Sequence, residues 1–241
     1  MQLSLVIPAY NEEARIAATL EHVLAYLDAR EYVSEVVIVN DGSADATGDV
    51  VRRYVGHAPT VVRYIEHPEN RGKGHAVRAG MLEYARGAYR VFFDADGSTP
   101  IEEVDKLWPC FESGADIVIG SRSIPGADVE VRQSRARESM GKVFNALLRL
   151  FRLTRFRDTQ CGFKGFTARA CETVFPRQTV MRFSFDAELL YIAEKRGLRI
   201  AEVPVRWLNS PLSRVHPITD ATRMFWDMVL IRLRALTGAY R

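Results

Sequence analysis

Short β-branched runs alternate with amphipathic helical patterns through the first half of the chain. Apolar runs typical of strands occur at residues 3–7, 36–39, 60–65, 91–93 and 117–120. The segments between them repeat apolar residues every three or four positions and predict helices over 12–27, 45–54, 74–84 and 101–111. This alternation predicts an α/β protein, Rossmann-like, with a mainly parallel sheet and helices on both faces.

The second half of the chain is less regular. Its patterns predict a late strand with Pro204 at an edge or bulge, over 199–207, and helices over 133–150, 184–196 and 218–236. Residues 157–166 form a polar, glycine-containing segment that predicts a loop or a short strand. No repeat, low-complexity tract or linker interrupts the 241 residues, and 47% of them are hydrophobic, so we expect one domain over 1–241.

An acidic pair directly follows one of the predicted strands. Asp94 and Asp96 lie one residue apart after the apolar run at 91–93, and in an extended segment such residues point to the same face. Two neighbouring carboxylates favour a hard cation such as Mg²⁺ or Mn²⁺, which often shares its ligands with substrate phosphates. The pair predicts a metal site that holds a diphosphate; the alternative is an acidic turn that caps a helix beginning near 98–100.

Further polar residues follow the carboxyl ends of other predicted strands. Tyr10, Asp41 and Arg122 each lie at or just beyond such an end, as Asp94 and Asp96 do. Ligands of open parallel sheets bind at these ends. The coincidence favours a ligand site over a purely structural turn.

The basic residues of the chain are unevenly distributed. The formal net charge is only +3, yet residues 131–157 carry eight basic side chains and one acidic one, Glu138. Such a block indicates an anionic partner, namely phosphate, a membrane surface or nucleic acid, and the alternative is a solvated arginine face of a helix. No nucleic-acid motif accompanies the block, so we expect no nucleic-acid partner.

The cysteines and the hydropathy of the chain bear on its location. Cys110, Cys161 and Cys171 lack the paired spacing of a metal site, and an odd number does not indicate a disulfide framework. The sequence has no signal-peptide pattern and no stretch of roughly 18 apolar residues. We therefore expect a cytoplasmic protein, with any membrane contact made peripherally at the cytoplasmic face or through another chain.

Several motifs occur in an order that resembles a known family. They are VIPAYNEE at 6–13, VNDGS at 39–43, NRGKG at 70–74, DAD at 94–96, GSR at 120–122 and DTQCGFK at 158–164. Together they resemble the inverting glycosyltransferases of family 2, which have the GT-A fold. The last two resemble the polyprenyl-phosphate sugar transferases of that family, especially the dolichyl-phosphate β-glucosyltransferase branch.

The resemblance implies a reaction and a cofactor. The enzyme would move a sugar, with glucose from UDP-glucose favoured, onto a polyprenyl phosphate and give a β-linked product. Asp94 and Asp96 would be catalytic by holding Mg²⁺ or Mn²⁺, which neutralises the leaving diphosphate. Ser98 stands where some relatives that transfer mannose have a glutamine, which leaves the third metal ligand open and favours the glucosyl branch.

The resemblance assigns donor binding to residues 1–122. Glu12 resembles a contact to the base or ribose, with a first-turn glutamate near the helix dipole as the alternative. Asp41 would bind the uracil edge or only shape an Asp-Gly turn. Lys73 opens a helix, where backbone N–H groups and a lysine favour anions. The expected nucleotide-sugar contacts are Pro8, Ala9, Tyr10, Glu12, Asp41, Ser43, Lys73, Asp94 and Ala95.

Acceptor binding is assigned to residues 123–241 together with Arg122. Arginine makes paired, charge-assisted hydrogen bonds to phosphate, so Arg122 and Arg137 are the expected catalytic contacts to the acceptor phosphate. Arg132 and Arg135 compete with Arg137 for this role. A surface loop charge is the alternative for Lys164. The residues expected on the acceptor side are Arg122, Arg132, Arg135, Arg137, Asp158, Gln160 and Lys164.

Two other functions remain open at this point. A polyprenyl phosphate is already anionic near neutral pH, whereas a hydroxyl acceptor needs a general base. The nearest alternative is a family 2 transferase that uses GDP-mannose or a hydroxyl or saccharide acceptor, with Asp158 or Asp186 as the base. The second is a non-catalytic nucleotide-sugar-binding subunit, and the joint presence of Asp94, Asp96 and Arg122 argues against it.

Two predicted helices offer a route to a lipid acceptor. The basic helix over 133–150 has an apolar side and could lie at a membrane interface. The helix over 218–236 could do the same or form a homodimer surface. Its alternative, packing on the core, is supported by the apolar residues all around it, among them Met224, Trp226 and Met228.

Overall fold

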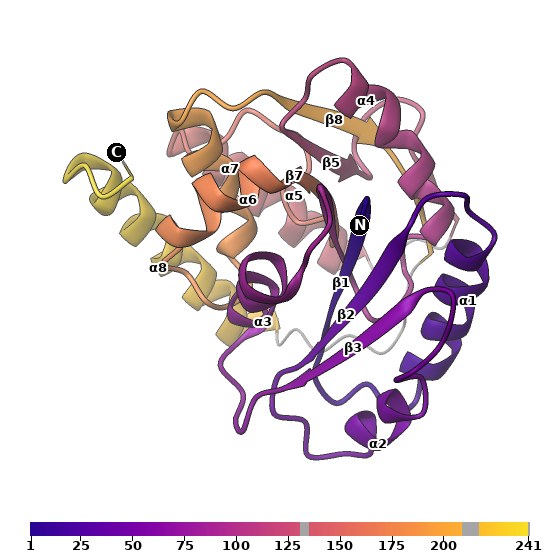
Figure 1. Cartoon of the computed structure of the whole chain (residues 1–241). Coiled ribbons are helices and arrows are strands. Elements are labelled where there is room, and N and C mark those ends of the chain that lie inside the picture. The colour runs from indigo at the N-terminus through magenta and orange to yellow at the C-terminus, as the bar shows by residue number, and fades with distance from the viewer. Residues whose placement is uncertain (131–134, 209–216, 241) are drawn as a thin grey trace.

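A seven-stranded, mainly parallel sheet forms the middle of the molecule (Figure 1). The computed structural model describes residues 1–130, 135–208 and 217–240, without the side chains of 135–140, 142 and 217–221. The strand order is β3-β2-β1-β4-β7-β5-β8. Strand β7 runs antiparallel to β4 and β5, and the other neighbouring pairs are parallel. The strands are β1 (Leu3–Ala9), β2 (Ser34–Asn40), β3 (Val61–Glu66), β4 (Tyr89–Phe93), β5 (Ile117–Ser121), β7 (Phe163–Thr167) and β8 (Ile200–Pro204).

Helices cover both faces of this sheet, because its side chains alternate between two apolar layers. Leu5 and Ile7 pack toward α1, whereas Val6 between them packs on the opposite side. The first layer holds α1 (Ile16–Asp28), α2 (Thr47–Arg52) and α4 (Trp108–Glu112). The second holds α3 (Lys73–Ala79), α6 (Ala168–Val174) and α7 (Phe185–Lys195).

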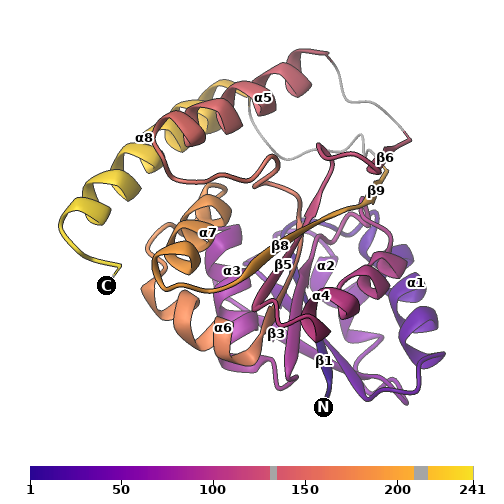
Figure 2. The ribbon, with the colours of Figure 1, turned by 90° about the horizontal axis from the view of Figure 1, so that it is seen from above.

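Two long helices lie next to each other at one edge of the molecule (Figure 2). They are α5 (Arg135–Leu150) and α8 (Pro217–Leu236), and both contribute to the core of the second layer. A small separate pair of parallel strands, β6 (Asp128–Val129) and β9 (Arg206–Trp207), lies beyond β8. None of the helices within the described residues is long and apolar enough to cross a membrane.

The predicted α/β architecture is confirmed, and three element predictions need correction. Helix α1 begins at Ile16, so Glu12 precedes it and is not a first-turn residue. The predicted helix over 101–111 is a 3₁₀ helix, Ile101–Lys106, followed by α4, because Pro109 starts a new helix. The helix predicted over 74–84 ends as α3 at Ala79 and continues through one π-helical turn, Gly80–Tyr84.

The segment at 157–166, predicted as a loop or a short strand, contains the start of β7. It is a loop up to residue 162, and Phe163–Thr167 is a central strand between β4 and β5. Alternation places Phe163 in the first apolar layer, and Lys164 and Phe166 on the face covered by α7. The sequence did not predict the central place of this strand in the sheet, because its lysine is buried only through a tertiary partner.

The register of the strands gathers the predicted site residues. Parallel pairing aligns Ala9 with Asn40 and Val6 with Phe92, so β1, β2 and β4 end at the same edge of the sheet. Antiparallel pairing of Phe93 with Phe163 brings the start of β7 to that edge as well. The residues that follow β1, β2 and β4 therefore meet those that precede β7, although the four segments are distant in the sequence.

Candidate functional site at the strand ends

Asp94 lies where β4 and β7 meet, and its surroundings are closely fitted. Its backbone N–H donates to the carbonyl of Gly162 at 3.1 Å. A Cβ atom on Gly162 would come within 1.8 Å of Asp94 Oδ2, so a side chain at this position would displace the carboxylate. Lys73 Nζ, at the start of α3, lies 2.6 Å from Asp94 Oδ1. A glycine and a lysine from separate segments thus fix the first carboxylate.

Asp96 is held differently from Asp94. Its Oδ1 accepts a hydrogen bond from the backbone N–H of Ser98 at 2.9 Å, so the predicted acidic turn exists beside the predicted ligand site. Among the described residues Asp96 makes no ion pair. The residue between the two aspartates, Ala95, is buried, and its carbonyl accepts from Thr19 Oγ1 at 2.9 Å.

A cation that the sequence did not single out, Arg15, lies beside the same strand end. It forms an ion pair with Glu12, with a second hydrogen bond from Nη2 to Oε1 at 2.8 Å. The hydrogen bond to Glu12 raises the pKa of Arg15, and the charges of Asp96 and Asp94 add to this effect. Arg15 therefore lies within electrostatic reach of both carboxylates. The only signal in the sequence was the three-residue spacing between Glu12 and Arg15.

Lys73 is surrounded by carboxylates. Burial alone would lower its pKa, but the charges of Asp94, Asp186 and Asp96 raise it above the usual value. Lys73 is thus held as an ammonium ion at the position where a cation contacts Asp94. Oxygen donors that already attract an ammonium ion fit a hard divalent cation, which would be held by Asp94 and Asp96.

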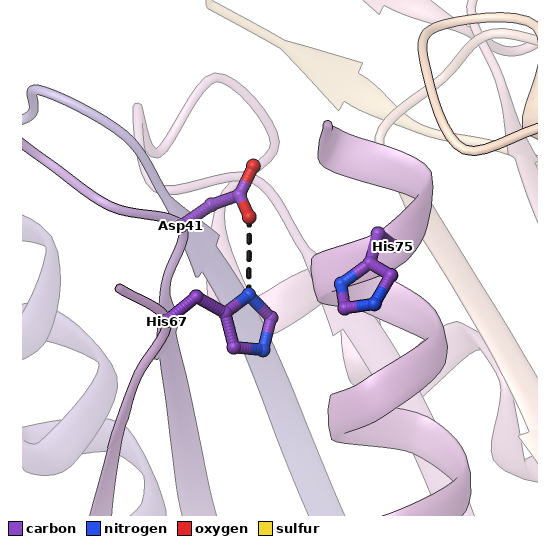
Figure 3. A group of neighbouring side chains, drawn as sticks. All are labelled: Asp41, His67 and His75. Carbon is purple, nitrogen blue, oxygen red and sulfur yellow. Dashed lines mark hydrogen bonds and ion pairs between the residues drawn. The ribbon is translucent and has the colours of Figure 1, made fainter. Parts of the chain in front are cut away.

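Asp41 connects the end of β2 to the segment at 70–74. Its carboxylate accepts from the backbone N–H groups of Arg71 at 3.1 Å and Gly72 at 2.8 Å. His67 Nδ1 lies 3.1 Å from Asp41 Oδ1 (Figure 3). Gly42, with φ of 69°, forms the Asp-Gly turn that was predicted as the alternative role of Asp41. The carboxylate itself reaches beyond that turn and fixes the start of α3.

His67 and His75 were not predicted as site residues. Their rings meet edge to face with centroids 4.8 Å apart, and with Asp41 they form a group whose ligand atoms lie within 4.8 Å of one another. His75 Nδ1 is buried without a hydrogen-bond partner among the described residues, and burial lowers the pKa of His75. The donor types suit a metal ion, although an ion there would displace the existing bonds of Asp41.

The remaining predicted donor contacts lie on the same edge. Pro8 and Ala9 end β1, and Tyr10, 39% exposed, follows them with its ring available to a ligand. Ser43 Oγ donates to Asn40 Oδ1 at 2.5 Å and accepts from the backbone N–H of Asn11 at 2.9 Å. Ser43 therefore holds the two strand-end loops together.

Lys164 and Asp186 form a buried ion pair behind the strand ends. Lys164 Nζ lies 2.6 Å from Asp186 Oδ1 and 2.6 Å from the carbonyl of Cys161, and Lys164 is fully buried. The alternative of a surface loop charge is therefore wrong. Burial raises the pKa of Asp186, while Lys164 and Lys73 oppose that change. Asp186 lies in the first turn of α7, so the pair joins this helix to the sheet.

Arg122 and Asp158 form a second, bidentate pair. Nε and Nη2 of Arg122 donate to the two carboxylate oxygens of Asp158 at 2.7 and 2.9 Å, and the backbone N–H of Arg122 adds a third bond at 3.0 Å. Burial would raise the pKa of Asp158, but Arg122 lowers it to about 2. The guanidinium carbon lies 5.3 Å from the centre of the Trp207 ring. Gln160 donates its backbone N–H to Asp158 at 3.2 Å.

The other predicted acceptor residues lie in or before α5. Arg135 and Arg137 belong to its first turn, and their side chains are outside the described part of the structure. Arg132 lies outside the described residues. The strand ends thus bring the residues predicted to bind the nucleotide sugar close to Arg122, Asp158 and Lys164. The contacts of Arg132, Arg135 and Arg137 stay predictions.

The sheet, with its carboxylates at the strand ends, has the GT-A fold. The chain superimposes on glucosyl-3-phosphoglycerate synthase of Mycobacterium tuberculosis, solved with Mn²⁺, UDP-glucose and phosphoglyceric acid, with a TM-score of 0.69 and 19% identity. The match covers 98% of this chain and 80% of that one. A second structure of that protein, with Mn²⁺, UDP and glucosyl-3-phosphoglycerate, gives a TM-score of 0.68 over 96% and 79% of the two chains, at 20% identity.

Sequence comparison defines the family more narrowly. The model of glycosyl transferase family 2 matches residues 4–175, and the chain belongs to this family. Dolichyl-phosphate β-glucosyltransferase of Drosophila melanogaster is 40% identical over all of this chain and 77% of its own length. The proteins of that name from Homo sapiens and Saccharomyces cerevisiae are 37% and 34% identical, over 100% and 99% of this chain and 78% and 76% of theirs. The predicted family is confirmed.

Removing one partner of the buried pair should destabilise the fold. Lys164→Met leaves Asp186 without its cation, and we expect the free energy of unfolding to fall by about 3–5 kcal/mol in urea denaturation. The double variant Lys164→Met/Asp186→Leu removes both charges and should recover most of that loss. A single variant as stable as the unchanged chain would mean that Asp186 is neutral in the folded protein.

The Arg122–Asp158 pair should resist acid. Because the folded pKa of Asp158 is about 2, below the usual value of about 3.9, its charge stabilises the fold above about pH 4, and this contribution disappears as the pH falls toward 2. The shift corresponds to roughly 2 kcal/mol. The difference in unfolding free energy between the chain and Asp158→Asn should stay constant down to about pH 5 and shrink below about pH 4. A difference that shrinks already near neutral pH would contradict this pairing.

Proposed function

We propose that this glycosyltransferase transfers glucose from UDP-glucose to a polyprenyl phosphate of the dolichyl or undecaprenyl type, with inversion to a β-linked product. Relatives named dolichyl-phosphate β-glucosyltransferase match essentially the whole chain, which supports this acceptor and this sugar. The departure at Ser98 from the glutamine of mannose-transferring relatives supports glucose over mannose.

One observation above all supports a phosphate as the acceptor. Each of the two carboxylates considered as general bases is already paired with a cation. Asp158 is tied bidentately to Arg122, and its pKa of about 2 makes it a weak base. Asp186 is 4% exposed and bonded to Lys164. A hydroxyl acceptor needs a base that reaches it. A phosphate acceptor brings an oxygen that is already anionic, so these two carboxylates can serve as structural partners.

On the donor side, we assign binding to residues 1–122. Asp94 and Asp96 would hold Mg²⁺ or Mn²⁺, which when bound neutralises charge on the leaving diphosphate. Lys73 and Arg15 keep positive charge beside these carboxylates. The proposed contacts to the nucleotide sugar are Pro8, Ala9, Tyr10, Glu12, Asp41, Ser43, Lys73, Asp94 and Ala95. The close fit of Gly162 against Asp94 holds one ligand of this set in place.

On the acceptor side, we assign binding to residues 123–241 with Arg122. Asp158 fixes the plane of the Arg122 guanidinium through Nε and Nη2, and a fixed plane loses less entropy when it meets phosphate. Arg132, Arg135 and Arg137 would bring further positive charge from α5 and the residues before it. Lys164 and Gln160 act through their partners Asp186 and Asp158.

The reaction would then be a single displacement. A phosphate oxygen of the acceptor attacks the anomeric carbon from the side opposite the diphosphate, the bond to the diphosphate breaks, and the configuration inverts. Catalysis rests on positioning and on stabilising the leaving group. We propose that the protein works peripherally at the cytoplasmic face of a membrane, alone, as a homodimer or with a membrane-bound partner chain.

The decisive test of this function is lipid glucosylation. Purified chain is incubated with Mn²⁺, radiolabelled UDP-glucose and a polyprenyl phosphate, and the label is measured in the organic extract. We expect label in the lipid fraction, dependent on the acceptor and abolished by a chelator that removes the metal. Label that enters only a water-soluble saccharide would contradict the phosphate acceptor, and transfer from GDP-mannose alone would contradict the donor.

The acidic pair should be required for turnover but not for folding. Asp94→Asn and Asp96→Asn keep the size of the side chain and remove its charge, so we expect turnover to fall by about 100-fold or more with little change in the urea midpoint. Asp49→Asn, which changes an exposed aspartate on α2, is the matched control and should keep full activity. Lipid-dependent turnover retained in both site variants would refute the proposed metal ligands.

A further inference from the structure

Two strand ends and a helix start place a carboxylate and two imidazoles together. Parallel pairing aligns Asn40 of β2 with Glu66 of β3, so the next residues, Asp41 and His67, leave the sheet side by side. His75 lies in the first turn of α3, and its ring meets that of His67 edge to face. The three side chains therefore gather at one place although they come from three separate segments (Figure 3).

The distances within this group suit one metal ion. One ligand atom from each residue lies within 4.8 Å of the other two, and His67 Nδ1 lies 3.1 Å from Asp41 Oδ1. An ion with bonds of about 2.0–2.1 Å and tetrahedral angles holds its ligand atoms about 3.3–3.4 Å apart. Asp41 and His67 already have nearly this separation. The nitrogen of His75 needs to approach by about 1.5 Å at most, which a side-chain rotation supplies.

The existing contacts of Asp41 orient it for an ion. Its side chain is buried, and its Oδ2 accepts from the backbone N–H of Gly72 at 2.8 Å. Because an ionised carboxylate only accepts, His67 Nδ1 is the donor in the bond to Oδ1. A metal ion at Nδ1 replaces this proton, and the ring takes the tautomer that carries its proton on Nε2. The first bond that the ion displaces is therefore the one from His67, while Gly72 still holds the other oxygen.

His75 contributes a ring nitrogen that has no competing partner. Its Nδ1 is buried, and none of the described residues forms a hydrogen bond with it. Buried polar atoms are nearly always satisfied, so an unpartnered nitrogen beside a carboxylate indicates a missing ligand. His22 and His57 also pair with carboxylates, but in the described part of the chain neither pair has a third donor close enough to share an ion.

The donor types decide which metal this group would take. Two imidazoles and a carboxylate suit Zn²⁺ and similar transition-metal ions, whereas Asp94 and Asp96 offer carboxylate oxygens, which suit Mg²⁺ or Mn²⁺. A given set of nitrogen and oxygen ligands also binds Zn²⁺ more tightly than Mn²⁺. Three protein ligands leave the fourth position of a tetrahedral ion to water. The two sites therefore differ in their metal as well as in their place.

We propose that Asp41, His67 and His75 form a second metal site, which takes Zn²⁺ or a similar transition-metal ion and blocks donor binding when it is filled. An ion on Asp41 occupies the carboxylate that we assign to the base of the nucleotide sugar, so the ion and the donor exclude each other. This inhibitory role rests on the proposed function, whereas metal binding by the three side chains does not.

Zinc affinity can be measured with matched histidine variants. The full chain, without a histidine tag, is titrated with Zn²⁺ against a chromogenic chelator in excess Mg²⁺. His75→Phe keeps an aromatic ring against His67 and removes the nitrogens, and His22→Phe makes the same change at an exposed histidine. We expect one Zn²⁺ per chain, an affinity about 100-fold lower in His75→Phe and no loss in His22→Phe. Equal affinity in all three proteins, or no binding by the unchanged chain, would overturn the site.

Cobalt substitution identifies the ligands independently. Co²⁺ takes the place of Zn²⁺ in such sites and absorbs visible light most strongly when it is four-coordinate, and a bound thiolate adds a near-ultraviolet band. We expect visible bands in the unchanged chain and in His22→Phe that are lost in His75→Phe, with the same urea midpoint in all three. Bands that persist in His75→Phe, or a thiolate band from Cys110, would place the ion elsewhere and refute the assigned ligands.

Transfer assays separate this inference from the proposed function. With Mg²⁺ saturating, added Zn²⁺ should raise the KM for UDP-glucose and leave kcat unchanged, and His75→Phe should need about 100-fold more Zn²⁺ for the same effect. If Zn²⁺ binds at this site but the chain glucosylates no lipid, the proposed function fails and the metal site stands. If bound Zn²⁺ leaves KM unchanged, or inhibits His75→Phe equally, the inhibitory role is overturned.

Discussion

The buried ion pair between Lys164 and Asp186 is the interaction on which the arrangement of the site depends. Two charges removed from water are tolerated only while each remains the partner of the other. Since Lys164 belongs to the central strand β7 and Asp186 to the first turn of α7, the pair fixes this helix against the sheet directly behind the strand ends. The charge of Asp186 also reaches Lys73, whose ammonium contacts Asp94. A series of neighbouring opposite charges therefore links α7 to the carboxylate at the end of β4.

The same principle operates across the rest of the site. The carboxylates of Glu12, Asp94 and Asp158 are each paired with a cation. Such pairing holds charged groups in fixed positions before any substrate arrives, and it occupies carboxylate oxygens that would otherwise accept protons. A site built in this way suits a reaction that depends on orientation and charge stabilisation. That property, more than any single residue, connects the geometry to an acceptor that arrives already ionised.

Much of the fold and part of the site could be predicted from the sequence. The alternation of strands and helices gave the mainly parallel sheet, and the positions of Tyr10, Asp41 and Asp94 after apolar runs gave its functional edge. Local pattern failed where a residue's environment is created by distant segments. Lys164 was predicted on the acceptor side, with a loop charge as the alternative, and nothing near it in sequence predicts its burial. Arg15 was not predicted as a site residue, because Asp94 and Asp96, whose charges reach it, lie at another strand end.

The sequence by itself determined the fold class, the family and the residues that gather at the strand ends, because periodicity and short motifs are local properties of the chain. Tertiary structure alone decided which charges are paired and which face of α8 is exposed. The contact between Gly162 and Asp94 joins residues 68 positions apart, and the apolar residues of α8 are divided between the core and the surface only by the neighbours that cover one side. Ion pairing and burial depend on distance in space, and that distance is set only when the strands assemble.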